Sequence, residues 1–233
     1  MDKTTIAIVG KPSCGKSSIA RGINKLYKLS IISTGDILRK KAETNKKLSI
    51  IHTGKLVGDA YVINLVEKEK AKEEYKDGYV MDGFPRTLKQ AKTLDDVGLV
   101  VEIKRSDDNV RKLVAGRYRN KFTKKGWHET DTGFKFLKAL NMLEKRNDDE
   151  SETFESRLDI YNKKSPAILE FFKEQGKLLV VETGPIWDKQ AILEVINAEL
   201  IKRGLVKKKV QLCESFLKGL IRKISKGKGK ELS

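Results

Sequence analysis

The segment Gly10–Ser17 constrains the fold more than any other part of the sequence. It reads Gly-Lys-Pro-Ser-Cys-Gly-Lys-Ser and fits the pattern G-x4-G-K-S/T. A β-branched apolar run precedes it and a stretch of helical period follows it, which is the strand, loop and helix context of a phosphate-binding loop. Gly10 and Gly15 permit the tight backbone path, so that successive N–H groups and the helix N-terminus face one phosphate group. We therefore expect a nucleotide-binding α/β protein.

The side chains of this segment, called the phosphate loop below, suit a nucleoside triphosphate with its metal ion. Lys16 supplies a positive point charge, and Ser17 offers a hydroxyl group to Mg²⁺, which takes few protein ligands beside water and phosphate oxygens. Cys14 is interpreted as a small residue whose backbone faces the phosphate, because no second cysteine lies nearby in the sequence to support a redox role. The loop residues expected to contact the donor nucleotide are Pro12, Ser13, Cys14, Gly15, Lys16, Ser17 and Ser18.

Short β-branched runs alternate along the chain with charged stretches of helical period. We expect five buried strands, at Thr4–Val9, Leu29–Ser33, Gly78–Met81, Leu99–Ile103 and Lys177–Val181. Strands that alternate with helices form a parallel sheet with helices on both faces, so the predicted fold class is a three-layer α/β/α protein with a five-stranded parallel sheet. In such sheets ligands bind at the carboxyl ends of the strands, where the phosphate loop falls.

Two segments between these strands, residues 34–77 and 107–176, are too long for plain crossovers and should carry inserted lobes. Within the second, Lys121–Gly133 is rich in turn-forming residues and lacks apolar anchors, and we interpret it as a mobile flap. The helical period of Phe134–Arg146 predicts one amphipathic helix, which would stiffen this lobe. The apolar side of that helix would hold Phe136, Leu137, Leu140 and Leu143.

Composition limits the partners and the compartment. The net charge of +17 favours anionic partners, namely nucleotides, nucleic acid or an acidic membrane surface. The only cysteines, Cys14 and Cys213, are far apart, so the sequence predicts neither a disulfide framework nor a four-ligand zinc site. No apolar run of 18 residues occurs, and the first strand begins almost at the N-terminus, so we expect a cytoplasmic protein without a signal peptide.

Residues 204–233 form a basic tail with nine Lys or Arg residues against two Glu. Such a tail would act as a basic amphipathic helix, lying on an anionic membrane or docking on a protein partner, and a helix packed on the body is an equal alternative. Nucleic-acid binding is disfavoured, because the charge is not accompanied by a pattern of interleaved aromatic residues. The apolar residues that recur in the tail at helical spacing are Val210, Cys213, Leu217, Leu220 and Ile224.

Two further motifs close the second and third predicted strands. Ser33–Arg39 reads Ser-Thr-Gly-Asp-Ile-Leu-Arg, and Met81–Ala91 contains Asp-Gly-Phe-Pro-Arg. With these motifs the sequence resembles the adenylate kinase family of nucleoside monophosphate kinases. The resemblance covers residues 4 to about 200 and continues through Gly54–Val57, Gly116-Arg117, Arg146–Asp149 and Arg157-Leu158.

The resemblance implies a kinase domain at residues 1–203, with an insertion for the acceptor nucleotide at about 34–65 and a zinc-free lid insertion at about 117–150. It also implies a reversible, Mg²⁺-dependent phosphoryl transfer from ATP to AMP that gives two ADP. A monomeric enzyme is expected. Such a transfer needs concentrated positive charge and in-line positioning, with little covalent work by the protein.

Arginines at matched motif positions would supply that charge. The catalytic residues implied are Lys16, Arg86, Arg117, Arg146 and Arg157. AMP would be bound by Thr34, Arg39, Lys55, Leu56, Val57, Gly83, Phe84, Arg86, Gln90, Arg146 and Arg157. Beyond the phosphate loop, ATP would be bound by Arg117, Gly126 and Trp127. The metal ion would be held by Ser17, by Asp82 through water, and by Asp36, whose Thr-Gly-Asp context is also a helix-capping sequence.

Two positions depart from the family pattern on the donor side. Leu113 stands where the family usually has an arginine stacked on the donor base, and Lys125 replaces an arginine of the flap. ATP is therefore the default donor and GTP the alternative. His128 is interpreted as a hydrogen-bonding flap residue rather than a metal ligand.

Two alternative functions stay open at this point. UMP/CMP kinases of the same superfamily tend to carry Ala in place of Thr34 and Asn after the Pro-Arg pair, so Thr87 and Gln90 disfavour that substrate class. The alternative from another class is a kinase-like binding module whose function lies in the basic tail. The presence of Lys16, Asp82 and the five arginines argues against such a loss of activity.

Overall fold

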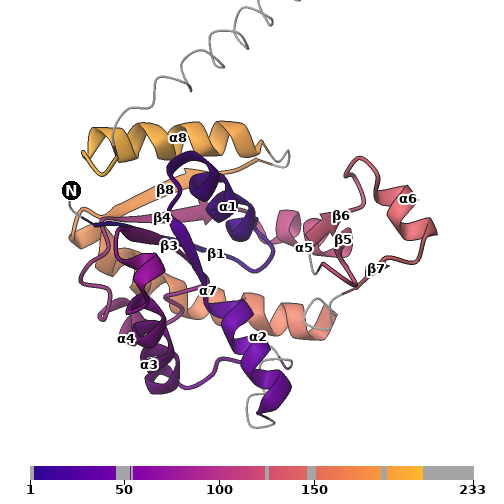
Figure 1. The fold of residues 1–233 in the computed structure, drawn as a ribbon, viewed down its shortest axis with the longest axis horizontal. Helices are drawn as coiled ribbons and strands as arrows, with labels where there is room; N and C mark the ends of the chain where they lie inside the picture. The colour runs from indigo at the N-terminus through magenta and orange to yellow at the C-terminus, as the bar shows by residue number, and fades with distance from the viewer. Residues whose placement is uncertain are drawn as a thin grey trace, which may run out of the picture.

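The computed structural model describes residues 3–45, 53, 55–123, 126–145, 151–184 and 188–206. In these residues a parallel sheet lies between two layers of helices, and a small lobe projects from the body (Figure 1). The predicted three-layer α/β/α class is confirmed.

Each of the five predicted strands is present, with ends within one residue of the prediction. They are β1 (Thr4–Gly10), β2 (Ser30–Ser33), β3 (Gly78–Asp82), β4 (Leu99–Lys104) and β8 (Leu178–Glu182). Their order in the sheet is β2-β3-β1-β4-β8, and every neighbouring pair is parallel. The carboxyl ends of all five strands therefore lie at one end of the sheet.

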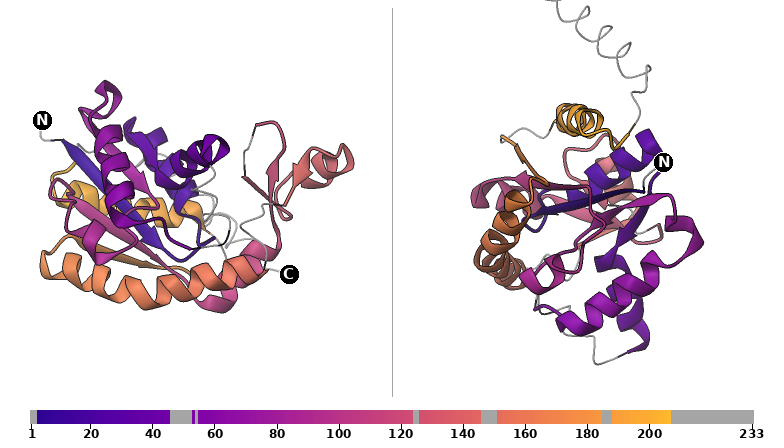
Figure 2. Two further views of the ribbon diagram at one scale, coloured as in Figure 1. Left: turned by 90° about the horizontal axis from the view of Figure 1, so that it is seen from below. Right: turned by 90° about the vertical axis from the view of Figure 1, so that its left-hand side faces the viewer.

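Alternation along β1 builds a separate apolar core on each face of the sheet. Ile6 and Ile8 join one cluster of buried residues, whereas Ala7 and Val9 join the other, because successive side chains of a strand point to opposite faces. Helices cover both clusters, and α7 runs along one side of the body in the left view of Figure 2. The helices of the body are α1 (Lys16–Tyr27), α2 (Thr34–Thr44), α3 (Asp59–Lys70), the 3₁₀ turn η2 (Glu73–Tyr75), α4 (Leu88–Ala91), α5 (Asp107–Ala115), α7 (Ser151–Glu174) and α8 (Lys189–Lys202).

The projecting lobe, called the lid below and comprising residues 117–145, is built on its own antiparallel sheet. The segment interpreted as a flap, Lys121–Gly133, contributes a strand to this sheet. Asn120 closes the turn after the first strand, since its side-chain oxygen accepts from the N–H groups of Phe122 (3.0 Å) and Thr123 (2.9 Å). The strands, in the order β6-β5-β7, are β6 (Gly126–His128), β5 (Arg117–Asn120) and β7 (Leu143–Glu144).

The prediction of one helix over Phe134–Arg146 is wrong. Helix α6 (Phe134–Ala139) has only six residues, because Asn141 takes a left-handed conformation with φ 53°. The N–H of Met142 then donates to the carbonyl oxygen of Leu137 (3.0 Å), as in the Schellman motif that ends many helices at Gly or Asn. The chain turns there into β7.

The apolar side expected for that helix does not form either. Phe136 and Leu140 are 67% and 54% exposed, whereas Leu143 is buried in β7. Phe134 is buried and meets Tyr118 of β5 edge-on, with ring centroids 5.1 Å apart. The lid therefore has a small apolar core of its own.

The last described residues close the body at the amino ends of the strands. Leu205 and Val206 pack against one of the two apolar clusters, and the hydroxyl group of Thr4 donates to the carbonyl oxygen of Leu205 (2.6 Å). The body thus extends at least to Val206. The rest of the basic tail, residues 207–233, lies outside the described residues, and with it the predicted amphipathic helix. Among the helices that are described, none is long and apolar enough to cross a membrane.

Candidate active site

The phosphate loop joins β1 to α1 at the carboxyl end of the sheet. Gly15 is the N-cap residue of α1 in a left-handed conformation (φ 99°), and no side chain of the described residues caps the helix there. The first N–H groups of α1 therefore point out of the helix end toward the loop. Such a helix end attracts phosphate through these groups and through the helix dipole.

Lys16, the first residue of α1, reaches back across the loop. Its Nζ atom donates to the carbonyl oxygens of Gly10 (2.7 Å) and Lys11 (2.6 Å). These two hydrogen bonds hold the ammonium group at the mouth of the loop. The predicted positive charge of the loop is thus fixed in place by its own backbone.

Positive charge is concentrated around Lys16. Burial lowers the pKa of its ammonium group. The guanidinium groups of Arg86 and Arg157 act in the same direction, whereas the carboxylate of Asp82 opposes the shift. Two guanidinium groups from two other segments therefore lie within electrostatic reach of Lys16. Such a cluster is stabilised by an anion of several charges, such as a polyphosphate.

The first two predicted metal residues meet beside the loop. The hydroxyl group of Ser17 donates to a carboxylate oxygen of Asp82, the last residue of β3. Ser17 is exposed and Asp82 is buried, so the pair has access to solvent on one side only. This donor set fits Mg²⁺, which retains most of its waters when a protein binds it. Within the described ranges, no group of three or more His, Cys, Asp or Glu side chains is placed to hold a metal ion.

Asp36, the third predicted metal residue, has the contacts of a helix-capping turn. Its N–H donates to the side-chain oxygen of Ser33, the N-cap residue of α2 (3.4 Å). Its carboxylate pairs with the guanidinium group of Arg39. Ser33-Thr-Gly-Asp36 therefore forms the capping turn of α2, and the metal role of Asp36 stays a prediction.

Two arginines follow the neighbouring strands β2 and β3. Arg39 lies on α2, and Arg86 lies in the loop between β3 and α4. The Nε atom of Arg86 donates to the carbonyl oxygen of Gly83 (2.9 Å), and its Nη2 atom lies 3.1 Å from the place that a Cβ on Gly83 would take. Gly83 also has φ 85°, so any side chain there would be strained and would crowd the guanidinium group.

A hydrogen-bond network fixes the buried side chain of Gln90, the residue that the resemblance assigns to the acceptor base. Its side-chain oxygen accepts from the N–H of Arg86 (2.7 Å), and its amide nitrogen donates to Oδ1 of Asp59 (2.8 Å). Thr87 donates to the same oxygen of Asp59 (2.9 Å). Sequence analysis missed Asp59, because an acidic residue in the first turn of a helix is ordinarily explained by the helix dipole alone.

The other predicted acceptor residues differ in their burial. Thr34 is 2% exposed, and its hydroxyl group has no hydrogen-bond partner among the described residues. Burial of such a group costs about 1–3 kcal/mol, so the position favours contact with a ligand. Phe84 is buried in an apolar cluster on which Val57 also packs, which leaves mainly their backbone for a nucleotide. Lys55 is exposed and Leu56 is partly buried.

The lid contacts the phosphate loop through its first residue. The Nη1 atom of Arg117 donates to the side-chain oxygen of Ser13 (3.0 Å). Trp127 is partly buried opposite Tyr118 in the pairing of β6 with β5, beside the exposed Gly126. The structure therefore brings Arg117 to the phosphate loop. Its role at the donor nucleotide stays a prediction.

The remaining donor-side positions are described only in part. Leu113 is partly buried on α5. The ring of His128 contacts the hydroxyl group of Thr130 through Nδ1 (2.8 Å), in keeping with a hydrogen-bonding role. Arg146 and Lys125 lie outside the described residues, and their roles stay predictions.

A first prediction concerns Gly116, which joins α5 to the lid. A Cβ atom there would lie 2.5 Å from Nε2 of His128, so the substitution Gly116→Ala should push β6 away from β5. Overpacking of this kind costs about 1–3 kcal/mol. Amide hydrogen exchange of Gly126–His128 should become about tenfold faster, while exchange in β1 stays unchanged.

The substitution His128→Ala provides the control for this prediction. The double variant Gly116→Ala/His128→Ala lacks the ring that the added methyl group would meet. The rate of amide hydrogen exchange in its lid should therefore approach that of His128→Ala alone. If Gly116→Ala were to accelerate exchange equally with and without the ring, the steric explanation would be wrong.

Comparison with known proteins agrees with the arrangement of this site. A family model described as adenylate kinase matches residues 8–177. The adenylate kinase of Clostridium perfringens (strain SM101 / Type A) is 32% identical over 217 residues, covering 83% of this chain and 95% of that protein. The adenylate kinase of Listeria monocytogenes serotype 4a is 31% identical over 190 residues, covering 74% and 88%. That of Buchnera aphidicola subsp. Cinara cedri is 28% identical over 208 residues, covering 84% and 94%.

The matched region includes the phosphate loop from Gly10, the strand-end motifs with Arg39 and Arg86, and the lid. It also includes Arg157 on α7. The chain belongs to the adenylate kinase family.

Proposed function

We propose that this protein transfers a phosphoryl group reversibly from Mg²⁺-bound ATP to AMP, as an adenylate kinase. The observation that carries the proposal is the cluster of Lys16, Arg86 and Arg157 at the carboxyl end of the sheet. Negative charge spreads over the oxygens of a phosphoryl group during its transfer. A fixed set of cations stabilises this charge without having to reorganise at the moment of reaction.

On the donor side, the triphosphate is held by the phosphate loop. The N–H groups at the start of α1 and the ammonium group of Lys16 bind its phosphates, and Arg117 closes over them from the lid. Ser17 would hold Mg²⁺ directly and Asp82 would hold it through water, and the two side chains already contact each other. When bound, this ion neutralises charge on the phosphates during transfer.

On the acceptor side, Arg39 and Arg86 bind the α-phosphate of AMP. A guanidinium group can bind two phosphate oxygens at once, which fixes the direction of attack as well as the affinity. The buried hydroxyl group of Thr34 and the amide of Gln90 bind the adenine base, and Asp59 holds that amide in place. Arg157, whose charge acts on Lys16, binds the transferred phosphoryl group from α7.

The lid excludes water while the transfer proceeds. Water competes with AMP as the acceptor of the phosphoryl group, so a cover over the site protects the yield of ADP. We propose that the kinase domain, with its lid and its acceptor insertion, is a monomer. For the basic tail, association with an anionic membrane or a protein partner stays a prediction, because residues 207–233 lie outside the described residues.

A coupled assay with pairs of nucleotides tests this function. ATP and GTP are compared as donors, each with AMP, UMP and CMP as acceptors. We expect ATP with AMP to give the highest kcat/KM, since Thr34 and Gln90 stand at the acceptor base. GTP is the alternative donor, because Leu113 replaces the arginine usually found at the donor base. Absence of turnover with every pair would refute the proposed function.

A further inference from the structure

Two helices connect the lid to the body. α5 leads into the lid through Gly116 and Arg117, and α7 follows the lid and carries Arg157. Arg117 contacts Ser13 of the phosphate loop, and the charge of Arg157 acts on Lys16. The position of α5 relative to α7 therefore decides how the two arginines are placed around the loop.

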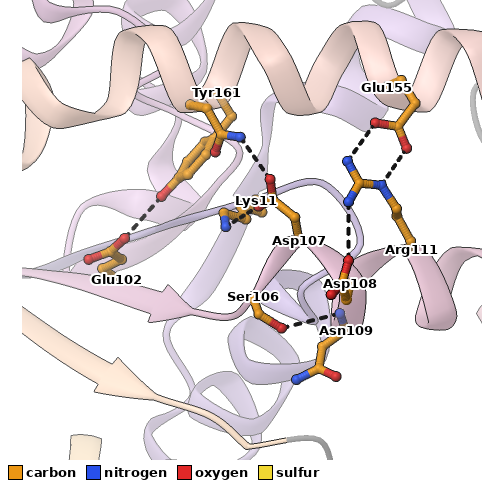
Figure 3. A network of polar contacts seen from close by, with 10 residues as sticks. Lys11, Glu102, Ser106, Asp107, Asp108, Asn109, Arg111, Glu155 and Tyr161 are labelled. Atoms are coloured by element: carbon orange, nitrogen blue, oxygen red, sulfur yellow. Dashed lines mark hydrogen bonds and ion pairs between the residues drawn. The ribbon is translucent and has the colours of Figure 1, made fainter.

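Two polar contacts hold α5 against α7 (Figure 3). Nδ2 of Asn162 donates to Oδ2 of Asp107 (3.2 Å). One turn further along α5, Arg111 donates through Nε to Oε1 of Glu155 (2.7 Å) and through Nη2 to Oε2 (2.9 Å). The second contact is thus a bidentate ion pair. The two contacts together are called the α5–α7 bridge below.

The spacing of the bridge residues lets each helix present two of them to the other helix. Asp107 and Arg111 are four residues apart, and Glu155 and Asn162 are seven apart, so each pair lies on one face of its helix. Glu155 and Arg157 are two residues apart and point in different directions. α7 thus uses one side for the bridge and another for the donor site.

The phosphate loop is attached to the same bridge. Nζ of Lys11 pairs with Oδ1 of Asp107, whose other oxygen accepts from Asn162. The hydrogen bond from Lys11 holds the pKa of Asp107 below its usual value, which keeps the carboxylate charged. One carboxylate therefore joins three elements, namely the phosphate loop, α5 and α7.

We propose that Asp107 and Arg111 are positioning residues for phosphoryl transfer, which fix Arg117 and Arg157 relative to the phosphate loop. The inference rests on the proposed function. A displacement of about 1 Å can cost a reaction about 10²-fold in rate, so a contact outside the substrate site affects turnover. The side chains of Arg111 and Glu155 are 45% and 46% exposed, and such an ion pair contributes little to folding stability. Effects on turnover and on folding are therefore separable here.

Charge reversal tests the bridge in the full-length protein. The variants are Arg111→Glu, Glu155→Arg and the double variant that combines them. We expect each single reversal to lower kcat and to raise the Kd for MgATP, each by about fivefold. The KM for AMP should stay within about twofold of wild type. The double variant re-forms the pair with reversed charges. It should bring kcat and Kd back to within about twofold of wild type.

Two further variants complete the test. Lys112→Glu is the matched control, because Lys112 is an exposed neighbour on α5 and its reversal changes the net charge by the same amount as Arg111→Glu. It should leave kcat and both nucleotide affinities unchanged. Asp107→Asn keeps the size of the side chain but removes the charge that holds Lys11. It should raise the Kd for MgATP by about fivefold without changing the KM for AMP.

The proposal is overturned by any of three results. The first is a loss of kcat and of MgATP affinity in Lys112→Glu equal to that in Arg111→Glu. The second is a change in the KM for AMP in the single reversals equal to the change in the Kd for MgATP. The third is a folded double variant whose kcat and Kd do not recover. Melting temperatures identify folded variants, and Asp107→Asn decides the matter if the double variant does not fold. The Kd is measured by calorimetry with MgATP alone, without turnover. Failure of wild type to phosphorylate AMP would therefore refute the proposed function, while the Kd values still test the bridge.

Discussion

Replacement of Lys16 by alanine is expected to lower kcat by about 10²- to 10³-fold, the loss seen when one fixed charge-stabilising group is removed from a transition state. Its ammonium group stands among the positive charges of Arg86 and Arg157 and is held by two carbonyl oxygens of the phosphate loop. The KM for AMP should change little, because the acceptor contacts come from other segments. Single-turnover kinetics with MgATP and AMP measure the effect on the chemical step directly.

Two comparisons separate catalysis from folding in that experiment. Lys25→Ala changes an exposed lysine of the same helix and should leave kcat unchanged. Lys16→Met keeps most of the side-chain volume and should be as inactive as Lys16→Ala. Circular dichroism and the melting temperature check that the fold is retained. A folded Lys16→Ala variant with kcat within about threefold of wild type would exclude the proposed role of this residue.

The second large effect is expected for Arg86→Ala, on the acceptor side. The variant should lower kcat/KM for AMP by about 10²- to 10³-fold, since it removes a charged, forked group from the α-phosphate. The Kd for MgATP should stay within about threefold of wild type. The hydrogen bond from Arg86 to Gln90 comes from the backbone N–H, so the substitution leaves the contact at the base side intact.

Arg86→Lys distinguishes charge from geometry at this position. Lysine keeps the positive charge but cannot bind two phosphate oxygens in a fixed plane, so we expect it to recover only part of the loss. Lys89→Ala, an exposed position on α4, is the control and should behave as wild type. If Arg86→Ala weakened MgATP binding as much as AMP binding, the assignment of this arginine to the acceptor would be wrong.

The sheet was predictable because its signals are local. A run such as Thr4–Gly10 is rich in β-branched residues and has no charged side chain, and a strand that is buried on both faces needs no other information. The lid was less predictable because its strands depend on pairing between distant residues. β7 has two residues, and their pairing with Arg119 and Asn120 has no counterpart in the local pattern. The helical period before them was genuine, but the left-handed Asn141 ended the helix early.

The residues of the candidate site also fall into a group that could be predicted from the sequence and a group that could not. The phosphate loop and the two strand-end motifs are continuous segments, so their residues could be named from the sequence. The contacts that tie segments together could not, because they depend on packing. Asp59 reaches Gln90 across 31 positions, and Arg117 reaches Ser13 across 104. Lys11 pairs with Asp107 across 96 positions, and nothing in the spacing of the two residues indicates it.

The hydrogen bond between Thr4 and Leu205 has a consequence for the whole molecule. Thr4 begins the central strand β1, whereas the phosphate loop follows the other end of that strand. Val206, the last residue that the structure describes, therefore lies at the pole of the protein opposite its nucleotide site. A tether attached there, whether to a surface, a bead or a fused protein, leaves the nucleotides free to exchange and the lid free to move.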